Sequence, residues 1–198
     1  MSNQIKINLP KGVARYPSLH RPDTKFNDLG VYKANVAVPV QEAEATMQKL
    51  QAIAKEELGK ALPKGDNMLW KMEIDDVTGD ETGMVMFKAT VKNIQKKDGE
   101  LWDRKPVQYD TDLNKVNEVI YGGSELVVAC DVRAWEFSGK KGLSLQPTAV
   151  QIHKLVGPSG GGDNPFEKSE GGFVSDGPSF ATNTTPDVVA DVDEIEDF

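Results

Sequence analysis

Apolar and polar residues alternate with the period of a β-strand over most of the chain between Gly12 and Val156. The even positions of residues 31–38 are apolar, and within residues 84–93 the odd positions from Val85 to Val91 are apolar. Successive side chains of a strand point to opposite faces, so each stretch predicts a half-buried strand. Further strands are expected over residues 68–74, 101–110, 125–137 and 143–156, with turns at 96–99 and 138–142.

The period changes between residues 41 and 62, where apolar residues recur every three or four positions. Glu and Lys lie between them, and Gly59 and Pro63 mark the end. This pattern predicts one amphipathic helix. The apolar positions are Ala43, Met47, Leu50, Ile53 or Ala54, Leu58 and Ala61. Residues 12–22 predict an extended segment broken at a proline. Short strands with one helix between early ones favour a small antiparallel barrel or sandwich that carries a helix.

The composition changes at Gly157, where a segment rich in Gly, Ser, Pro, Asn and Asp begins. Of the net charge of −8, residues 157–198 contribute −9, from ten acids and one base, whereas residues 1–156 carry +1. Too few large apolar residues follow Gly157 to offset the entropy of ordering them. The sequence therefore predicts a domain over 1–156 and a disordered acidic tail over 157–198. The near-neutral net charge of residues 1–156 is compatible with an anionic partner.

Several kinds of chemistry lack support in the sequence. Cys130 is the single cysteine and lies in an apolar strand, which predicts a buried, unreactive thiol. His20 and His153 are too far apart in sequence to indicate a metal cluster, so neither a metal nor a cofactor is expected. No apolar run reaches the length of a membrane span, and no leader peptide is evident, which favours a cytoplasmic location.

Basic residues interleaved with aromatic ones are the positive signal. Single-stranded nucleic acid is held by cations along its phosphates and by rings under its bases. The alternation places Tyr32, Trp70 and Phe87 in the core, so these rings are excluded. The candidate DNA-binding residues are Arg15, Tyr16, Arg21, Lys33, Lys88, Lys92, Lys96, Lys97, Trp102, Arg104, Lys105, Arg133, Trp135 and Lys140. The alternative to DNA binding is an ordinary solvated strand face, and it applies to Lys88 and Lys92 in particular.

The acidic tail suggests a competitor for the same cations. A tethered polyanion has an effective concentration in the millimolar range and can occupy a groove that holds phosphates. Phe198 adds a ring beside carboxylates, as a base lies beside a phosphate. The tail residues expected to bind partners are Asp191, Asp193, Glu194, Glu196, Asp197 and Phe198.

Four features together resemble the single-stranded DNA-binding replication proteins of short-tailed bacteriophages. They are Arg21-Pro22-Asp23 followed by Gly30-Val31-Tyr32-Lys33, the entry into a long strand over residues 122–126, the hairpin into residues 143–156, and an acidic terminus that ends in Phe198. The resemblance implies an OB-fold-like barrel with a helix inserted after the early strands. It also implies sequence-nonspecific binding of single-stranded DNA in replication or recombination, and tail contacts to the replicative polymerase and the helicase–primase. Members of the family often dimerise, so a homodimer is among the expected partners.

Two alternatives stay open. The first is an acidic-tailed interaction adaptor or chaperone that binds basic proteins and no DNA. The second is a hydrolase that uses the carboxylates of Asp75 and Asp76 or of Asp110 and Asp112. Because no nucleophile–base pair accompanies these carboxylates, we expect the protein not to be an enzyme.

Overall fold

The computed structural model describes residues 5–63 and 65–157 of the chain. The large sheet has nine strands, ordered β12-β11-β14-β13-β2-β5-β7-β6, with β1 pairing to β13. Its strands are β1 (Ile5–Asn8), β2 (Gly12–Ala14), β5 (Val36–Pro39), β6 (Trp70–Ile74), β7 (Glu81–Phe87), β11 (Val107–Tyr109), β12 (Lys115–Val116), β13 (Glu125–Phe137) and β14 (Lys140–Lys154). A small sheet, β3-β4-β8, contains β3 (Ser18–Asp23), β4 (Val31–Lys33) and β8 (Thr90–Lys92). A ribbon of β9 (Ile94–Gln95) and β10 (Leu101–Trp102) completes the set.

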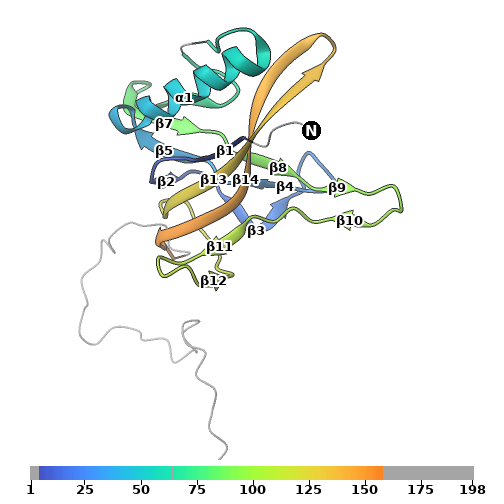
Figure 1. Ribbon diagram of the computed structural model, residues 1–198. Coiled ribbons are helices and arrows are strands. Elements are labelled where there is room, and N and C mark those ends of the chain that lie inside the picture. The colour runs from blue at the N-terminus through green and yellow to red at the C-terminus, as the bar shows by residue number, and fades with distance from the viewer. Residues whose placement is uncertain (1–4, 64, 158–198) are drawn as a thin grey trace, which may run out of the picture. The chain divides into compact units, whose positions relative to one another are not determined.

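Three stretches of chain pass from one sheet into the other. β2 leads into β3, β4 into β5, and β7 into β8, so the two sheets curl around a common interior (Figure 1). On the opposite side, an isolated parallel bridge joins Ala89 to Leu145 of β14. Within the described residues the ladders do not close completely, but this bridge brings the two ends of the curl together. The expected OB-fold-like, mainly β architecture with one inserted helix is confirmed.

Alternation decides which side of these strands is buried. Val36 pairs with Phe87, and Tyr32 pairs with Val91; all four are at most 3% exposed. Their neighbours Lys33 and residues 90 and 92 lie on the outer side. The predicted inner face of both stretches is therefore confirmed, and burial of that face is the main favourable term for folding.

Helix α1 (Val40–Leu58) covers the end of the curled sheets beside β5 and β7 (Figure 1). Its buried residues are Ala43, Leu50, Ile53 and Ala54, as the apolar spacing predicts. The helix ends earlier than residue 62, because Gly59 adopts a left-handed conformation with φ of 69° and its N–H donates to the carbonyl of Lys55. Ala61 consequently lies outside the helix and is exposed.

The predicted return strand over residues 101–110 is wrong as a single strand. The structure divides it into β10 and β11, which belong to different sheets. Pro106 has no N–H to give to a ladder, and the N–H of Arg104 donates to the side chain of Asn93 instead of to a strand. β11 then pairs in parallel with β14, a pairing that alternation does not reveal. β1 and β12 are too short for the alternation to predict them.

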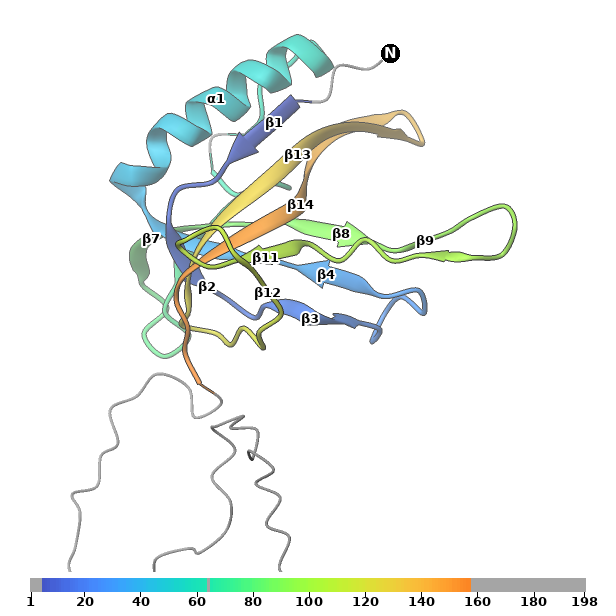
Figure 2. The same cartoon turned by 60° about the horizontal axis from the view of Figure 1, so that its bottom comes forward.

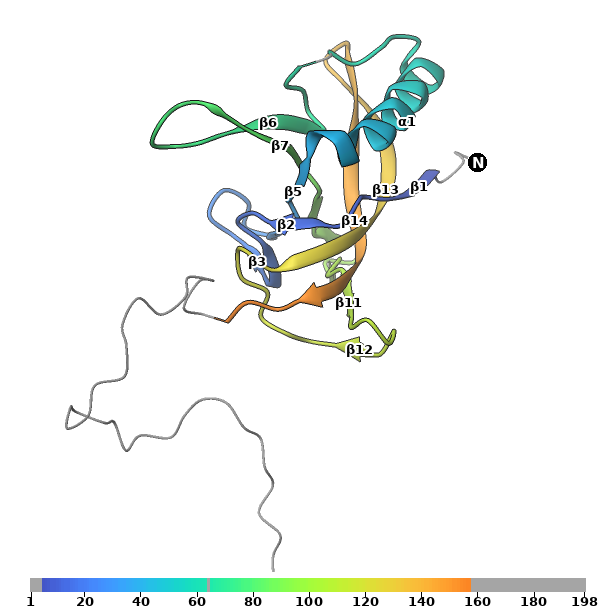
Figure 3. The same ribbon diagram turned by 90° about the vertical axis from the view of Figure 1, so that its left-hand side faces the viewer.

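Two hairpins extend beyond the curled sheets. The β13–β14 hairpin turns at Ser138 and Gly139, which have φ of 48° and 74°, and it projects past α1 in Figure 1. The β6–β7 hairpin projects separately, as Figure 3 shows. The β9–β10 ribbon extends from the small sheet (Figure 2).

Gly12 marks the closest approach of β2 to β5. A Cβ atom there would lie 2.6 Å from the carbonyl oxygen of Ala37 and 2.7 Å from Val38. We expect Gly12→Ala to lower the free energy of unfolding by about 1–3 kcal/mol, because the strands must separate to admit the methyl group. Urea unfolding measures the change. Gly65→Ala is the matched control, since a Cβ at Gly65 meets nothing within 4 Å; equal effects of the two substitutions would contradict this account.

Candidate nucleic-acid interface

The outer face of the small sheet carries two of the predicted lysines. Val31 pairs with Lys92, and Lys33 pairs with Thr90, so both lysines project from the side opposite the core. Lys33 forms an ion pair with Asp23 of β3. The hydrogen bond from Lys33 lowers the pKa of the Asp23 carboxyl. β4 and β8 therefore present two cations at neighbouring positions of one face.

A shallow hollow of about 200 Å³ lies on this face, between the small sheet and the loop that joins β3 to β4. Phe26, in that loop, borders the hollow and is 89% exposed, with the Nζ atom of Lys25 5.3 Å from the centre of its ring. Phe26 is not among the residues predicted from the sequence, because it lies in a loop, where no alternation separates buried from exposed positions. The one feature of the sequence that points to it is the basic residue Lys25 directly before the aromatic ring. The hollow combines an exposed ring with two lysines.

A second basic group lies beyond β8. The guanidinium carbon of Arg104 is 5.4 Å from the ring centre of Trp102, a cation–π contact. Its Nη2 donates to Oε1 of Gln146 at 2.7 Å. Burial, followed by the nearby charge of Arg133, lowers the pKa of Arg104. The structure thus brings two arginines together beside a half-exposed tryptophan, and Arg133 also pairs with Asp131, with 3.5 Å between Nη2 and Oδ2.

The two groups adjoin each other. Nη1 of Arg104 donates to the carbonyl of Lys92 at 3.4 Å. β8 also neighbours β14, which pairs with the strand of Arg133. Together these residues form one surface, which we name the basic band: Phe26, Lys33, Lys92, Trp102, Arg104 and Arg133.

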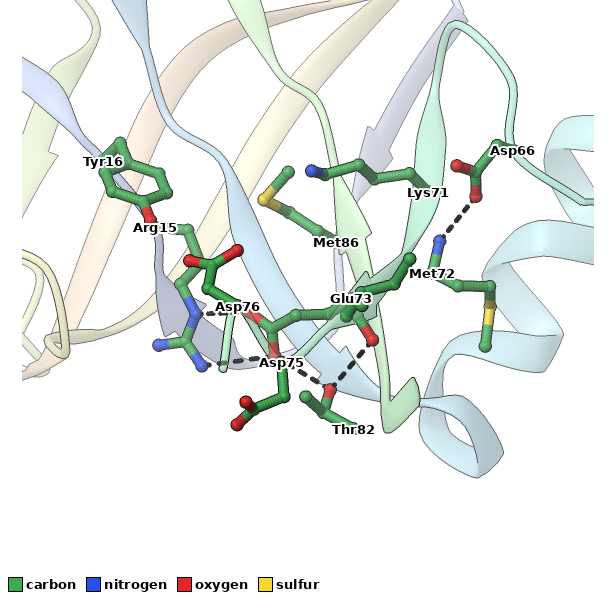
Figure 4. Close-up of a pocket in the computed structure, with 11 residues that line it drawn as sticks. Arg15, Tyr16, Asp66, Lys71, Met72, Glu73, Asp75, Asp76, Thr82 and Met86 are labelled. Carbon is green, nitrogen blue, oxygen red and sulfur yellow. Dashed lines mark hydrogen bonds and ion pairs between the residues drawn. The ribbon is translucent and has the colours of Figure 1, made fainter. Parts of the chain in front are cut away.

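Arg15 and Tyr16 lie at a different place, in a pocket of about 570 Å³ between the end of β2 and the β6–β7 hairpin (Figure 4). Nε of Arg15 is 2.6 Å from Oε1 of Glu73, so this arginine is already paired. Three further carboxylates line the pocket: Asp66, Asp75 and Asp76. Carboxylates repel phosphates, so this acid-lined pocket differs in character from the basic band.

Lys88 lies between these regions. Its Nζ donates to the carbonyl of Asn67 at 2.5 Å, and burial lowers its pKa. Asp66 and Lys71, both in the acid-lined pocket, are its charged neighbours. Lys88 therefore lies beside the acid-lined pocket, although the alternation of the sequence places it on the same face as Lys92.

The remaining candidates are spread over the hairpins and edges. Lys96 pairs with Glu100 at 2.5 Å in the β9–β10 ribbon, which also carries Lys97. Trp135 lies against Gly142 across the β13–β14 hairpin, whose turn precedes Lys140. The others are Arg21, exposed on β3, and Lys105, which donates to Oδ1 of Asn117.

Two of the carboxylates considered for hydrolysis, those of Asp75 and Asp110, accept hydrogen bonds from the backbone. Asp75 accepts from the N–H groups of Val77 and Thr78, and these bonds lower its pKa. Asp110 accepts from residues 112 and 114 in the same manner, and the Asn114 side chain lowers its pKa most. Burial raises the pKa of the Cys130 thiol to about 12. Asp75 and Asp110 thus hold the backbone of their own turns, and the Cys130 thiol is buried.

The described part of the chain contains no group of three or more His, Cys, Asp or Glu residues placed to hold a metal ion. None of its helices is long and apolar enough to span a membrane.

Solved structures share this fold, although no protein-family model and no curated protein sequence matches the chain. The single-stranded DNA-binding protein gp2.5 of bacteriophage T7 is 23% identical, with a TM-score of 0.54 over 87% of this chain and 100% of gp2.5. The single-stranded DNA-binding protein of bacteriophage Enc34, in complex with single-stranded DNA, is 17% identical, with a TM-score of 0.58 over 78% and 89% of the two chains. Its C-terminal truncation is 16% identical, with a TM-score of 0.57 over 77% and 87%. The predicted resemblance to these phage proteins is confirmed at the level of the fold.

The Arg15–Glu73 pair predicts a pH-dependent contribution to stability. The hydrogen bond from Arg15 lowers the pKa of Glu73, so the contribution is complete at neutral pH and is lost as the pH falls through the folded-state value. We expect Glu73→Gln to cost up to about 1 kcal/mol at pH 7 and nothing once Glu73 is protonated. Unfolding at several pH values measures this. Glu81→Gln, on the next strand, is the control; a cost independent of pH would refute the prediction.

Proposed function

We propose that this protein binds single-stranded DNA without sequence preference, through the basic band, and acts in phage DNA replication or recombination. The observation that carries the proposal is the meeting of four cations and two exposed rings on one outer face of an OB-fold-like body. The phage proteins that share this fold are named as single-stranded DNA-binding proteins, which supports the same function here. The fold alone does not carry it, since one fold hosts many functions.

The chemistry of the band fits a flexible polyanion. Lys92, Arg104 and Arg133 can neutralise phosphates, whereas Phe26 and Trp102 offer faces on which bases stack at about 1–3 kcal/mol each. Neither interaction distinguishes one base from another. A duplex hides its bases inside the stack, so rings of this kind favour a single strand.

The acidic tail has a proposed role as competitor and recruiter. Residues 158–198 lie outside the described part of the chain, so this role rests on their sequence and on the cations of the band. We propose that the tail competes with DNA for the band and, when displaced, binds the replicative polymerase and the helicase–primase.

The acid-lined pocket favours a second candidate function, binding of a basic protein by an adaptor that has no DNA ligand. Its four carboxylates complement lysine and arginine side chains. This candidate predicts no binding of oligonucleotides, so the experiment below separates the two.

Binding of the full chain to oligo-dT of a few tens of bases tests the proposal. We expect the logarithm of the affinity to fall linearly with the logarithm of salt concentration, by about 0.7 for each phosphate neutralised. Replacing Lys92 and Arg133 together by alanine should reduce that slope by roughly 1.4. Fluorescence anisotropy titrations at several salt concentrations measure both.

Lys49 and Lys55 provide the matched control, because the same double alanine substitution there removes two exposed cations from α1. The slope should then stay unchanged. Equal losses from both double variants, or binding that is indifferent to salt, would defeat the basic band as the site. A preference for duplex over single-stranded oligonucleotides would argue against the rings as stacking platforms.

Deletion of residues 187–198 tests the tail. It removes six carboxylate side chains, and we expect DNA binding to tighten by about threefold to tenfold at low salt because a tethered competitor is lost. A full-length variant with these acids changed to Asn or Gln should reproduce the gain, and Phe198→Ala isolates the ring. If the deletion left the affinity unchanged, competition would be excluded while the basic band would stand.

A further inference from the structure

Asn93 is a buried polar residue between two loops that each carry an exposed ring of the basic band. It follows β8 directly and is only 4% exposed. On one side lies the β3–β4 loop with Phe26, and on the other the turn after β10, which connects Trp102 to Arg104. A buried amide needs its hydrogen bonds satisfied, so its partners reveal what it holds.

The side chain and backbone of Asn93 bond to both loops at once. Nδ2 donates to the carbonyl of Leu29 at 2.9 Å, and the backbone N–H donates to the carbonyl of Gly30 at 3.1 Å. Oδ1 accepts from the N–H of Arg104, also at 2.9 Å. One residue thus spans the β3–β4 loop and the Arg104 turn.

Tyr32 holds the same turn from the core. Burial, followed by a hydrogen bond to Asp103, raises the pKa of the Tyr32 hydroxyl to about 12. The neighbour of Asp103 is Arg104, whose guanidinium contacts the Trp102 ring. The turn is therefore held at Arg104 by Asn93, and the Tyr32 hydroxyl lies beside the preceding residue, Asp103.

We propose that Asn93 is a positioning residue for DNA binding, which joins the two ring-bearing loops and keeps Phe26 and Trp102 in one arrangement before DNA arrives. This inference rests on the proposed function. Loops that are ordered in advance lose less conformational entropy on binding, so a residue that touches no DNA can still raise affinity. The same bonds keep Arg104 beside Lys92, because the N–H of the turn is fixed next to β8.

Asn93→Ala tests the proposal with two measurements. We expect affinity for oligo-dT to fall by about fivefold to tenfold, since both side-chain bonds are lost. The salt slope should stay that of the wild type, because no cation is removed. A residue that contacts phosphate would change the slope, so the pair of readings separates positioning from contact. Unchanged affinity of the folded variant would overturn the proposal.

Gln51→Ala is the matched control. Gln51 bridges α1 to Leu62 with the same pair of bonds, donating to the carbonyl at 3.0 Å and accepting from the N–H at 2.8 Å. It lies on the helix, apart from the basic band. Its removal should lower the melting temperature as Asn93→Ala does and leave DNA affinity unchanged. If both variants lost affinity equally, a general loss of stability would explain the effect and the proposal would fail.

Amide hydrogen exchange of the DNA-free protein tests the connection separately from the proposed function. Asn93→Ala should speed exchange in residues 24–30 and 101–105 together. Tyr32→Phe keeps the core ring and should speed exchange in residues 101–105 only. This variant replaces Asn93→Ala in the test if Asn93→Ala does not fold. Exchange unchanged in both segments would refute the connection. Wild-type protein that fails to bind oligo-dT would instead refute the proposed function.

Discussion

Burial of alternate side chains along strands that cross between two sheets is the constraint on which this structure depends. The β4–β5 and β7–β8 stretches each keep one face inside both sheets, where Tyr32, Val36 and Phe87 are almost wholly buried. A shift of one residue in either stretch would turn every side chain to the opposite face. The same pairing that buries the core therefore fixes which lysines project outward, and the candidate interface is a consequence of the core.

The outer surface divides its charges by place. Cations gather where β8 meets β14 and the Arg104 turn, whereas carboxylates line the pocket beside the β6–β7 hairpin. The body as a whole carries a net charge of only +1, so the proposed binding of a polyanion depends on this separation. Arg15 illustrates the point, because its pocket also holds Glu73 and three further carboxylates, which oppose the approach of a phosphate there.

Two loops that are joined by hydrogen bonds complete the proposed interface. Phe26 and Trp102 come from segments more than seventy residues apart in the chain. Both rings are exposed, so packing in the core does not hold either of them in place. Asn93 lies between the two segments with three hydrogen bonds, which a buried amide forms only when its surroundings are fixed. The proposed interface thus combines cations that project from the sheet with rings on loops that share a buried polar contact.

The sequence by itself determined the strands around residues 31–38, 84–93 and 125–137, the helix, the buried Cys130 and the basic, aromatic character of the body, because these follow from periodicity and residue type. It also indicated the phage resemblance that the shared fold confirms. Only the tertiary structure decided which basic residues meet. Arg15 and Arg104 look alike in sequence, yet one pairs with Glu73 in an acid-lined pocket and the other contacts a tryptophan. It also revealed Phe26 and Asn93, a loop residue and a buried amide. Local sequence patterns indicate which face of a strand is exposed to solvent. The neighbours of a side chain depend instead on pairings between segments far apart in the chain.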